Sequence, residues 1–345
     1  MKPPSHRTTL NRREFLRAGG GLGLAGLVAS ANPAARAAAP GRASPSAYDV
    51  SRFETTDPRL IGYVELRRFK APRPDARRLA VGPEGRLWIA AGHYVVAAGE
   101  TGAVWVEIAF NNPVRCVAVA PDGVVYAGLR DHVEVLDAAG KRTAVWESPR
   151  NRAWLTGLLA TADTVFAADS GNRVIWRHDR AGQVLGRLGE KDKDRDIPGF
   201  VLPSPHLDVE LHPDGLLRVN NTGRHLVEAY TFDGDREFFW GKPGMGIEAF
   251  CGCCNPIALA VLPDGRIVTA EKGLPRVKVY GAQGNLECVV AGVESFPENL
   301  RATRGESRND TLNLSLDIAA DSQGRIYILD PVSAEIRVMA PKPAA

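Results

Sequence analysis

Long apolar stretches are scarce in this chain of 345 residues. Beyond the first forty positions there is no apolar run of 18 or more uncharged residues, which is about the length that a helix needs to cross a membrane. We therefore expect no membrane span in the body of the chain. The apolar runs that do occur are only four to six residues long, too short for ordinary helices.

Other motifs are missing as well. The chain has no Gly-x-Ser-x-Gly element and no other recognisable nucleophile motif, so we name no catalytic residue and the sequence favours a non-enzymatic protein. Cysteine is rare, with five residues in all, but three of them fall within the four residues 251–254. This cluster, Cys251-Gly-Cys253-Cys254, is the most unusual feature of the sequence.

The N-terminus has the order of an export signal. Asn11-Arg-Arg-Glu-Phe-Leu-Arg17 precedes the glycine-rich apolar stretch Ala18–Ala31, and Ala35-Arg-Ala37 is a small-x-small cleavage pattern. The paired arginines resemble the twin-arginine export motif, which implies a periplasmic or secreted protein. An amphipathic N-terminal helix is the alternative.

Removal of residues 1–37 changes the charge of the chain. The whole chain carries a net +3, and residues 1–37 hold six Lys or Arg and one Glu, a net +5, which leaves −2 for the remainder. A weakly acidic protein lacks the basic surface that nucleic-acid binding requires, so we expect no nucleic-acid partner.

The rest of the chain repeats one unit six times. Each copy has an apolar run, a Pro-Asp-Gly turn or a variant of it, a second run, a polar loop and a third run. Cys116–Asp137 and Ile257–Gly284 are the clearest copies, and Thr161-Ala-Asp163 stands at the turn of a degraded one. Short β-branched runs joined by Asp-Gly turns are typical of antiparallel hairpins. Because units of roughly 37 to 59 residues fit propeller blades, we predict an all-β, six-bladed β-propeller.

Four segments follow from this interpretation. They are a cleaved signal peptide (1–37), a flexible linker (38–56), the propeller (57–341) and a tail (342–345). The sixth unit ends at its third strand, whereas Ile61–Phe69 is a spare strand at the other end. Pairing this strand into the last blade would close the ring and remove an exposed edge.

The third unit resembles the NHL repeat family. The resemblance rests on Asp169-Ser-Gly-Asn-Arg-Val-Ile175 after Val165-Phe-Ala167, and it extends over roughly residues 59–340. It implies a propeller fold, whereas NHL propellers include lyases, lactonase-like enzymes and modules that bind protein or RNA. The cysteine cluster is not part of the NHL consensus.

Three long connections between blades gather on one face of such a propeller. They are Arg187–Ser204, Asp235–Asn255 and Ala291–Asn313. Because loops on a rigid scaffold often carry function, this face is the predicted site. Tolerated surface insertions are the alternative.

Cys251, Cys253 and Cys254 lie at the end of the second connection. Three soft ligands this close would suit copper, zinc or an iron–sulfur cluster, with a fourth ligand from elsewhere. Disulfides or redox thiols are the first alternative in an exported protein, although adjacent cysteines pair only with strain. Cys288 and Cys116 are the other available partners. Inert, structural cysteines are the third possibility.

Further candidates lie on the same face, at strand ends and in loops of the fourth and fifth units. Each His could supply a fourth ligand, and the arginines could instead tie loops to carboxylates within the fold. These candidates are His206, Asp208, Asn221, Arg224, His225, Glu271 and Arg276.

Three functions remain open. The first is a monomeric binding or redox-accessory protein that works with another exported protein and holds a metal or cluster through its cysteines. The second is an enzyme of the lyase or lactonase type with a divalent metal on the propeller axis. The third is an interaction scaffold with disulfide-locked loops.

Overall fold

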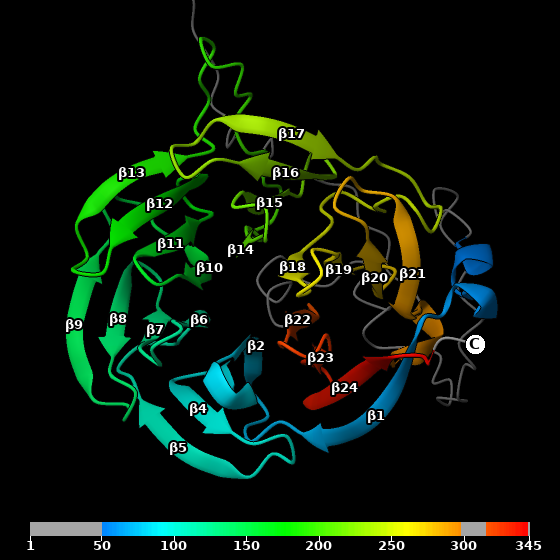
Figure 1. Cartoon of the computed structure of the whole chain (residues 1–345), viewed down its shortest axis with the longest axis horizontal. Helices are drawn as coiled ribbons and strands as arrows, with labels where there is room; N and C mark the ends of the chain where they lie inside the picture. Colours follow the sequence, from blue (N-terminus) through cyan, green and yellow to red (C-terminus); the bar gives the residue numbers. More distant parts are fainter. Residues whose placement is uncertain (1–49, 298–314, 344–345) are drawn as a thin grey trace, which may run out of the picture. The chain divides into compact units, whose positions relative to one another are not determined.

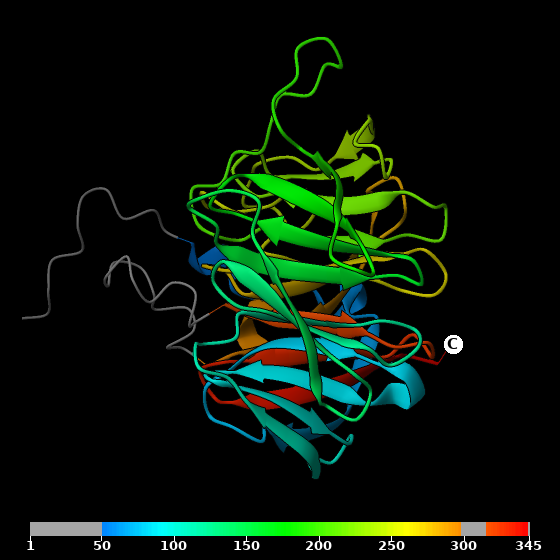
Figure 2. The same ribbon diagram turned by 90° about the vertical axis from the view of Figure 1, so that its left-hand side faces the viewer.

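Six four-stranded antiparallel sheets are built from residues 50–297 and 315–343, the part of the chain that the computed structural model describes. The predicted signal peptide, most of the linker, residues 298–314 with the end of the third long connection, and the last two residues of the tail lie outside these ranges. The sheets stand around a common axis as the six blades of a propeller, which confirms the predicted fold (Figure 1). Figure 2 shows the same ring from the side.

Each blade takes four strands, which follow one another from the axis outward. Blade I is β2 (Ala76–Val81), β3 (Leu87–Ala91), β4 (Tyr94–Ala98) and β5 (Val104–Ala109); blade II is β6 (Cys116–Val119), β7 (Val125–Gly128), β8 (His132–Leu136) and β9 (Arg142–Glu147). Blade III is β10 (Leu155–Ala160), β11 (Thr164–Asp169), β12 (Val174–Asp179) and β13 (Val184–Leu188); blade IV is β14 (Val209–Leu211), β15 (Leu217–Asn221), β16 (Leu226–Tyr230) and β17 (Arg236–Trp240). Blade V is β18 (Ala258–Val261), β19 (Ile267–Glu271), β20 (Arg276–Tyr280) and β21 (Leu286–Ala291); blade VI is β22 (Asp317–Ala320), β23 (Ile326–Asp330), β24 (Glu335–Pro341) and β1 (Tyr63–Lys70).

The Pro-Asp-Gly segments form the tight turns between the first two strands of a blade. In blade II the Gly123 amide donates to the Ala120 carbonyl over 2.9 Å, and Gly265 makes the same bond to Leu262 in blade V. Both glycines have φ of +85°, a left-handed conformation that costs glycine little. The Pro-Asp-Gly segments therefore form tight turns, as the sequence predicted.

Ring closure follows the prediction. β1 pairs antiparallel with β24 from Tyr63 opposite Pro341 to Lys70 opposite Glu335, so the first strand completes the last blade. Arg337 adds an ion pair to Glu65 at 2.7 Å. The N-terminal strand thus covers the edge that β24 would otherwise expose.

The core consists of six apolar clusters, each between two neighbouring blades within the described residues. Between blades IV and V, for example, Val227 and Trp240 pack with Leu259, Ile267 and Tyr280. Because each cluster needs both of its blades, the ring is stabilised as a unit rather than blade by blade.

Residues 50–56, the end of the predicted linker, lie on the propeller. η1 (Ser51–Phe53) follows Val50, which packs with Cys251, Leu274 and Val293. The folded part of the chain therefore begins before residue 57. Among the described residues no helix has the length and apolarity needed to cross a membrane.

Candidate functional site

The connection from β17 to β18 ends in residues 251–255, which we call the thiol loop. Phe250, directly before them, is fully buried against Trp240 and Tyr280, with ring centroids 6.2 and 5.7 Å away. Asn255 closes the loop, since its Nδ2 donates to the Cys251 carbonyl at 2.7 Å and to the Lys272 carbonyl at 2.9 Å. The Lys272 amide returns a hydrogen bond to Asn255 Oδ1 at 2.9 Å. An aromatic anchor and one asparagine thus hold this loop on blade V.

The three sulfurs of the thiol loop fall into a pair and a single atom. Cys253 is exposed, and its Sγ lies 3.2 Å from the Sγ of the buried Cys254. The Sγ of Cys251 is instead buried 3.9 Å from the Lys272 carbonyl. All five cysteines are free, so no disulfide locks these loops. Within residues 50–297 and 315–343, no three His, Cys, Asp or Glu side chains gather closely enough to hold a metal ion.

The surroundings of Cys253 and Cys251 raise the pKa of both thiols. The hydrogen bond with Cys254 and then partial burial raise the pKa of Cys253, against a smaller opposing effect of Lys272. Burial, followed by the Glu271 carboxylate, raises the pKa of Cys251. The raised pKa values favour the protonated thiols of Cys251 and Cys253, and the nucleophilicity of both increases with pH.

Glu271 and Arg276, both predicted site residues, are buried beneath the thiol loop. Glu271 binds Lys278 Nζ through Oε1 at 2.7 Å and Arg276 Nη2 through Oε2 at 2.8 Å. Its Oε2 also accepts the Cys251 amide at 3.2 Å. Glu271 thus ties the loop to blade V, and Arg276 is held in place as its ion-pair partner.

The candidates of blade IV are spread out. Asn221 is buried and bound to the Val201 amide and to Glu228 Oε1, at 2.9 and 3.2 Å. Arg224 is exposed, and His225 is half-buried with φ of +59°. Burial lowers the pKa of His225. The structure gives Asn221 a structural role and does not bring Arg224 to the thiol loop through any hydrogen bond or ion pair among the described residues.

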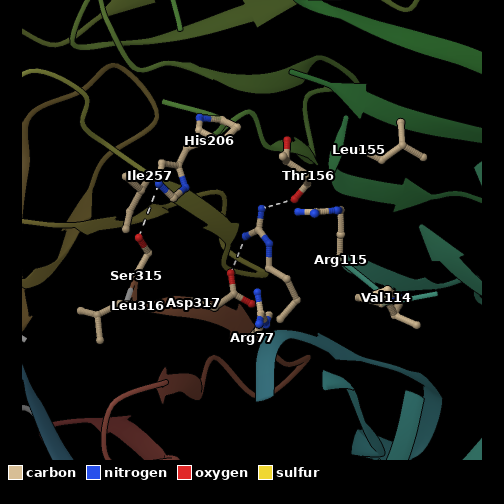
Figure 3. A pocket seen from close by; sticks show the side chains of 13 residues that line it. Arg77, Val114, Arg115, Leu155, Thr156, His206, Ile257, Ser315, Leu316 and Asp317 are labelled. Carbon is tan, nitrogen blue, oxygen red and sulfur yellow. Dashed lines mark hydrogen bonds and ion pairs between the residues drawn. The ribbon is translucent and has the colours of Figure 1, made fainter. Parts of the chain in front are cut away.

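His206 and Asp208 lie at the centre of the face, where the inner strands of the blades begin. A hollow opens there on the propeller axis and holds a cavity of about 60 Å³. We call it the axial mouth and define it by Arg77, Arg115, Thr156, His206, Ser315 and Asp317 (Figure 3).

Charges just below the axial mouth are paired. Arg78 binds Asp317 Oδ1 at 2.5 Å and approaches Asp208 Oδ2 at 3.5 Å. The same carboxylates join neighbouring blades, because Asp317 accepts the Leu79 amide at 2.6 Å and Asp208 accepts the Leu259 amide at 3.1 Å. Asp208 is thus engaged in holding inner strands together.

His206 is buried, with its Nε2 3.4 Å from the Ser315 hydroxyl. Burial, then Lys272 and Arg78, hold its pKa well below the usual range, so its imidazole is neutral. Lys272 links the two parts of the face: its Nζ donates to Ser204 Oγ at 3.0 Å, and its backbone carries the Asn255 contacts of the thiol loop. The axial mouth and the thiol loop therefore adjoin.

Glu210 gives the channel below the mouth a pH response. It lines this channel with Arg78, Asp208 and Asp317. Burial, then the two aspartates, raise its pKa well above the ordinary value of 4.5, against the effect of Arg78. Above about pH 4.5 the unfolded chain loses this proton while the folded chain keeps it, so stability falls as pH rises.

We expect Glu210→Gln to be more stable than the parent at pH 7.5 and equal to it near pH 4. Urea unfolding at the two pH values measures the difference, and the exposed Glu237→Gln is the control. An equal gain at both pH values would contradict the protonated Glu210.

Sequence reasoning missed Arg77 and Arg115. Each stands directly before the strand residue that faces the channel, and the matching positions of the other blades are uncharged: Thr156, Leu207, Ile257 and Leu316. Aligning the six units would have shown two arginines at a position that is otherwise uncharged.

Comparison with known proteins supports the fold. No family model matches the chain, and no curated protein matches its sequence. Among solved structures, it resembles a streptogramin B lyase with a TM-score of 0.55 and 12% identity, over 81% of this chain and 98% of that one. It also resembles a catalytically inactive virginiamycin B lyase from Staphylococcus aureus with quinupristin, with a TM-score of 0.53 and 13% identity, over 77% and 80% of the two chains. At such identities the likeness concerns the fold alone.

Proposed function

We propose that this chain is an exported binding and redox-accessory protein whose working group is the Cys253–Cys254 dithiol. The observation that carries the proposal is the contact of 3.2 Å between the two sulfurs, one of them exposed, on the built-up face of a rigid ring. The twin-arginine pattern supports export to an oxidising compartment, where a reversible dithiol can exchange electrons with a partner.

The reaction is thiol–disulfide exchange. The Cys253 thiolate attacks a disulfide of another exported protein or a small disulfide, and one thiol leaves. Cys254 then attacks the mixed disulfide at the Cys253 sulfur, so the second thiol leaves and the Cys253–Cys254 bond forms. The pair gives up two electrons and two protons, and the partner disulfide takes up both.

Such a bond would be easily reversed. Consecutive Cα atoms lie about 3.8 Å apart across a trans peptide, below the roughly 4.4–6.8 Å of ordinary disulfides. Strained and exposed disulfides are the easily reduced ones, which suits repeated exchange better than permanent cross-linking.

Metal ligation by Cys251, Cys253 and Cys254 stays a prediction, and the donor set fits it poorly as the loop lies. Copper, zinc or an iron–sulfur cluster would need the Cys251 sulfur beside the other two, whereas that sulfur faces the Lys272 carbonyl. The lyase-type alternative shares only a fold with the solved lyases. Its candidate ligands are His206, Asp208, His225 and Glu271. Of these, His206 and Asp208 already contact Ser315 and the Leu259 amide, and Glu271 binds Arg276 and Lys278.

Oxidation in a glutathione redox buffer should reduce the free thiols from five to three, with a mass lower by two hydrogen atoms. Cys253→Ser and Cys254→Ser should each abolish this change, and Cys288→Ser, on the outer strand of blade V, should keep it. The exchange rate should rise with pH, because the pKa of Cys253 is raised. Free-thiol titration and intact mass measure both effects.

Two results would overturn the dithiol role. One is five free thiols at every redox potential tested. The other is copper, zinc or iron in natively exported protein that is lost in Cys251→Ser as well as in Cys253→Ser, which would favour the three-cysteine ligand set.

A further inference from the structure

Two arginines in the axial mouth lack counter-charges. Arg77 and Arg115 form no ion pair with any residue in the ranges 50–297 and 315–343. Arg78, their neighbour, is by contrast paired with Asp317 and approached by Asp208. The charge of Arg78 is thus neutralised, whereas the charges of Arg77 and Arg115 at the mouth have no counter-charge among the described residues.

Local structure aims both side chains into the hollow. Arg77 is the extra residue of a bulge in β2, since Ala76 pairs with Ala91 and Arg78 with Ala90. Bulges redirect the side chain of the extra residue. Arg115 directly precedes β6, and its guanidinium lies 3.7 Å from the centroid of the Trp154 ring. Figure 3 shows Arg77 and Arg115 reaching the hollow from neighbouring blades.

The positive charges of Arg77 and Arg115 repel each other. The pKa of Arg115 is lowered by burial first and then by Arg77. Half-buried guanidiniums without a counter-charge are unfavourable, and planar anions with two or three oxygens satisfy them best. An oxyanion bound between them would relieve both the repulsion and the lost hydration.

Neutral polar groups complete the surroundings. His206 is uncharged, as its lowered pKa indicates, and Thr156 presents a hydroxyl that contacts the Leu207 carbonyl at 2.8 Å. Asp317 also lines the mouth, and its carboxylate is bound by Arg78 and the Leu79 amide. The cavity of about 60 Å³ has room for a few waters or for one carboxylate or phosphate group, not for a whole large ligand.

We propose that the axial mouth binds the carboxylate or phosphate group of a small molecule, with Arg77 and Arg115 as the anion-binding residues. The remainder of that molecule would lie outward, on the face that also carries the thiol loop. This site is independent of the dithiol and could position a small anionic partner beside it.

The test uses the full exported protein and defined probes: succinate, inorganic phosphate, and succinamide as the uncharged analogue of succinate. Calorimetric titration should show binding of succinate or phosphate that weakens with ionic strength, and no binding of succinamide. Trp154 fluorescence should change with the same affinity, because Arg115 lies over its ring. The anion that binds more tightly distinguishes a carboxylate ligand from a phosphate ligand.

Arg77→Gln and Arg115→Gln should each weaken binding by about tenfold or more, the loss expected for one charge-assisted contact. Arg86→Gln is the matched control, because Arg86 also lies over a tryptophan, Trp105 at 4.8 Å, but outside the mouth. Unchanged binding in both mouth variants, an equal loss in Arg86→Gln, or no binding of either anion would overturn the proposal. Cys253→Ser should bind the anion normally, so failure of this site and failure of the dithiol are told apart.

Discussion

Glu271→Ala is expected to lower the free energy of unfolding by about 3–5 kcal/mol, the usual cost of removing one member of a buried ion-pair group. Glu271, Arg276 and Lys278 are almost completely buried, and the single carboxylate faces both cations. Its loss would leave two buried positive charges without a counter-ion. Lys278, whose pKa burial already lowers, would then release its proton.

The effect should extend to the thiol loop and the segment before it. Lys278 Nζ also donates to the Ile247 and Ala249 carbonyls, each at 2.9 Å, and Glu271 holds the Cys251 amide. We therefore expect faster alkylation of the buried Cys251 in the variant, beside the loss of stability.

Urea unfolding gives the free energy, and Glu287→Ala on the same blade is the control. Within the described residues Glu287 forms a single long, partly exposed ion pair, with Arg266 at 3.7 Å, so its removal should cost below about 1 kcal/mol. Equal effects of the two substitutions would show that the Glu271 group contributes no more than a surface pair.

Removal of β1 is expected to abolish cooperative folding. A chain that begins at residue 72 lacks the outer strand of blade VI, and with it Tyr63, which is 2% exposed in the core between blades V and VI. β24 would then expose a row of unpaired backbone groups, and such an edge promotes aggregation because it can pair with strands of other chains. The loss should exceed the roughly 5–15 kcal/mol by which ordinary domains are stable.

A synthetic peptide of residues 58–71, added in trans, should restore part of the fold, because the missing strand supplies hydrogen bonds and side chains but no turn. Circular dichroism and gel filtration report the recovery, with a chain that begins at residue 38 as reference. A truncated chain that unfolds as cooperatively as the reference would contradict closure by β1.

The fold could be predicted because its information is local and repeated. Pro-Asp-Gly turns such as Pro121–Gly123 recur at blade spacing, and a lone strand at Ile61–Phe69 had a single unpaired edge to fill. Pairing this strand with the last blade satisfies backbone hydrogen-bonding groups that would otherwise stay unpaired, so closure is the expected arrangement. Five of the six sheets consist of strands that are consecutive in sequence, so they required no information from distant pairs of residues.

The site was harder to predict, because the decisive contacts are between blades or depend on side-chain direction. Glu271 looked like an available ligand in sequence, but Arg276 and Lys278 point at it from the next strand. Cys251 looked like a partner of Cys253, but Asn255 and the Lys272 carbonyl turn its sulfur away. Spacing reveals which residues are near, not which way they face.

Because the first strand completes the last blade, the ring can close only after nearly the whole chain has been synthesised. Glu65 and its ion-pair partner Arg337 lie 272 positions apart. At about 5–20 residues per second, a ribosome needs roughly 15–50 s between making the two. During that interval the backbone groups of β1 that later pair with β24 have no partner strand.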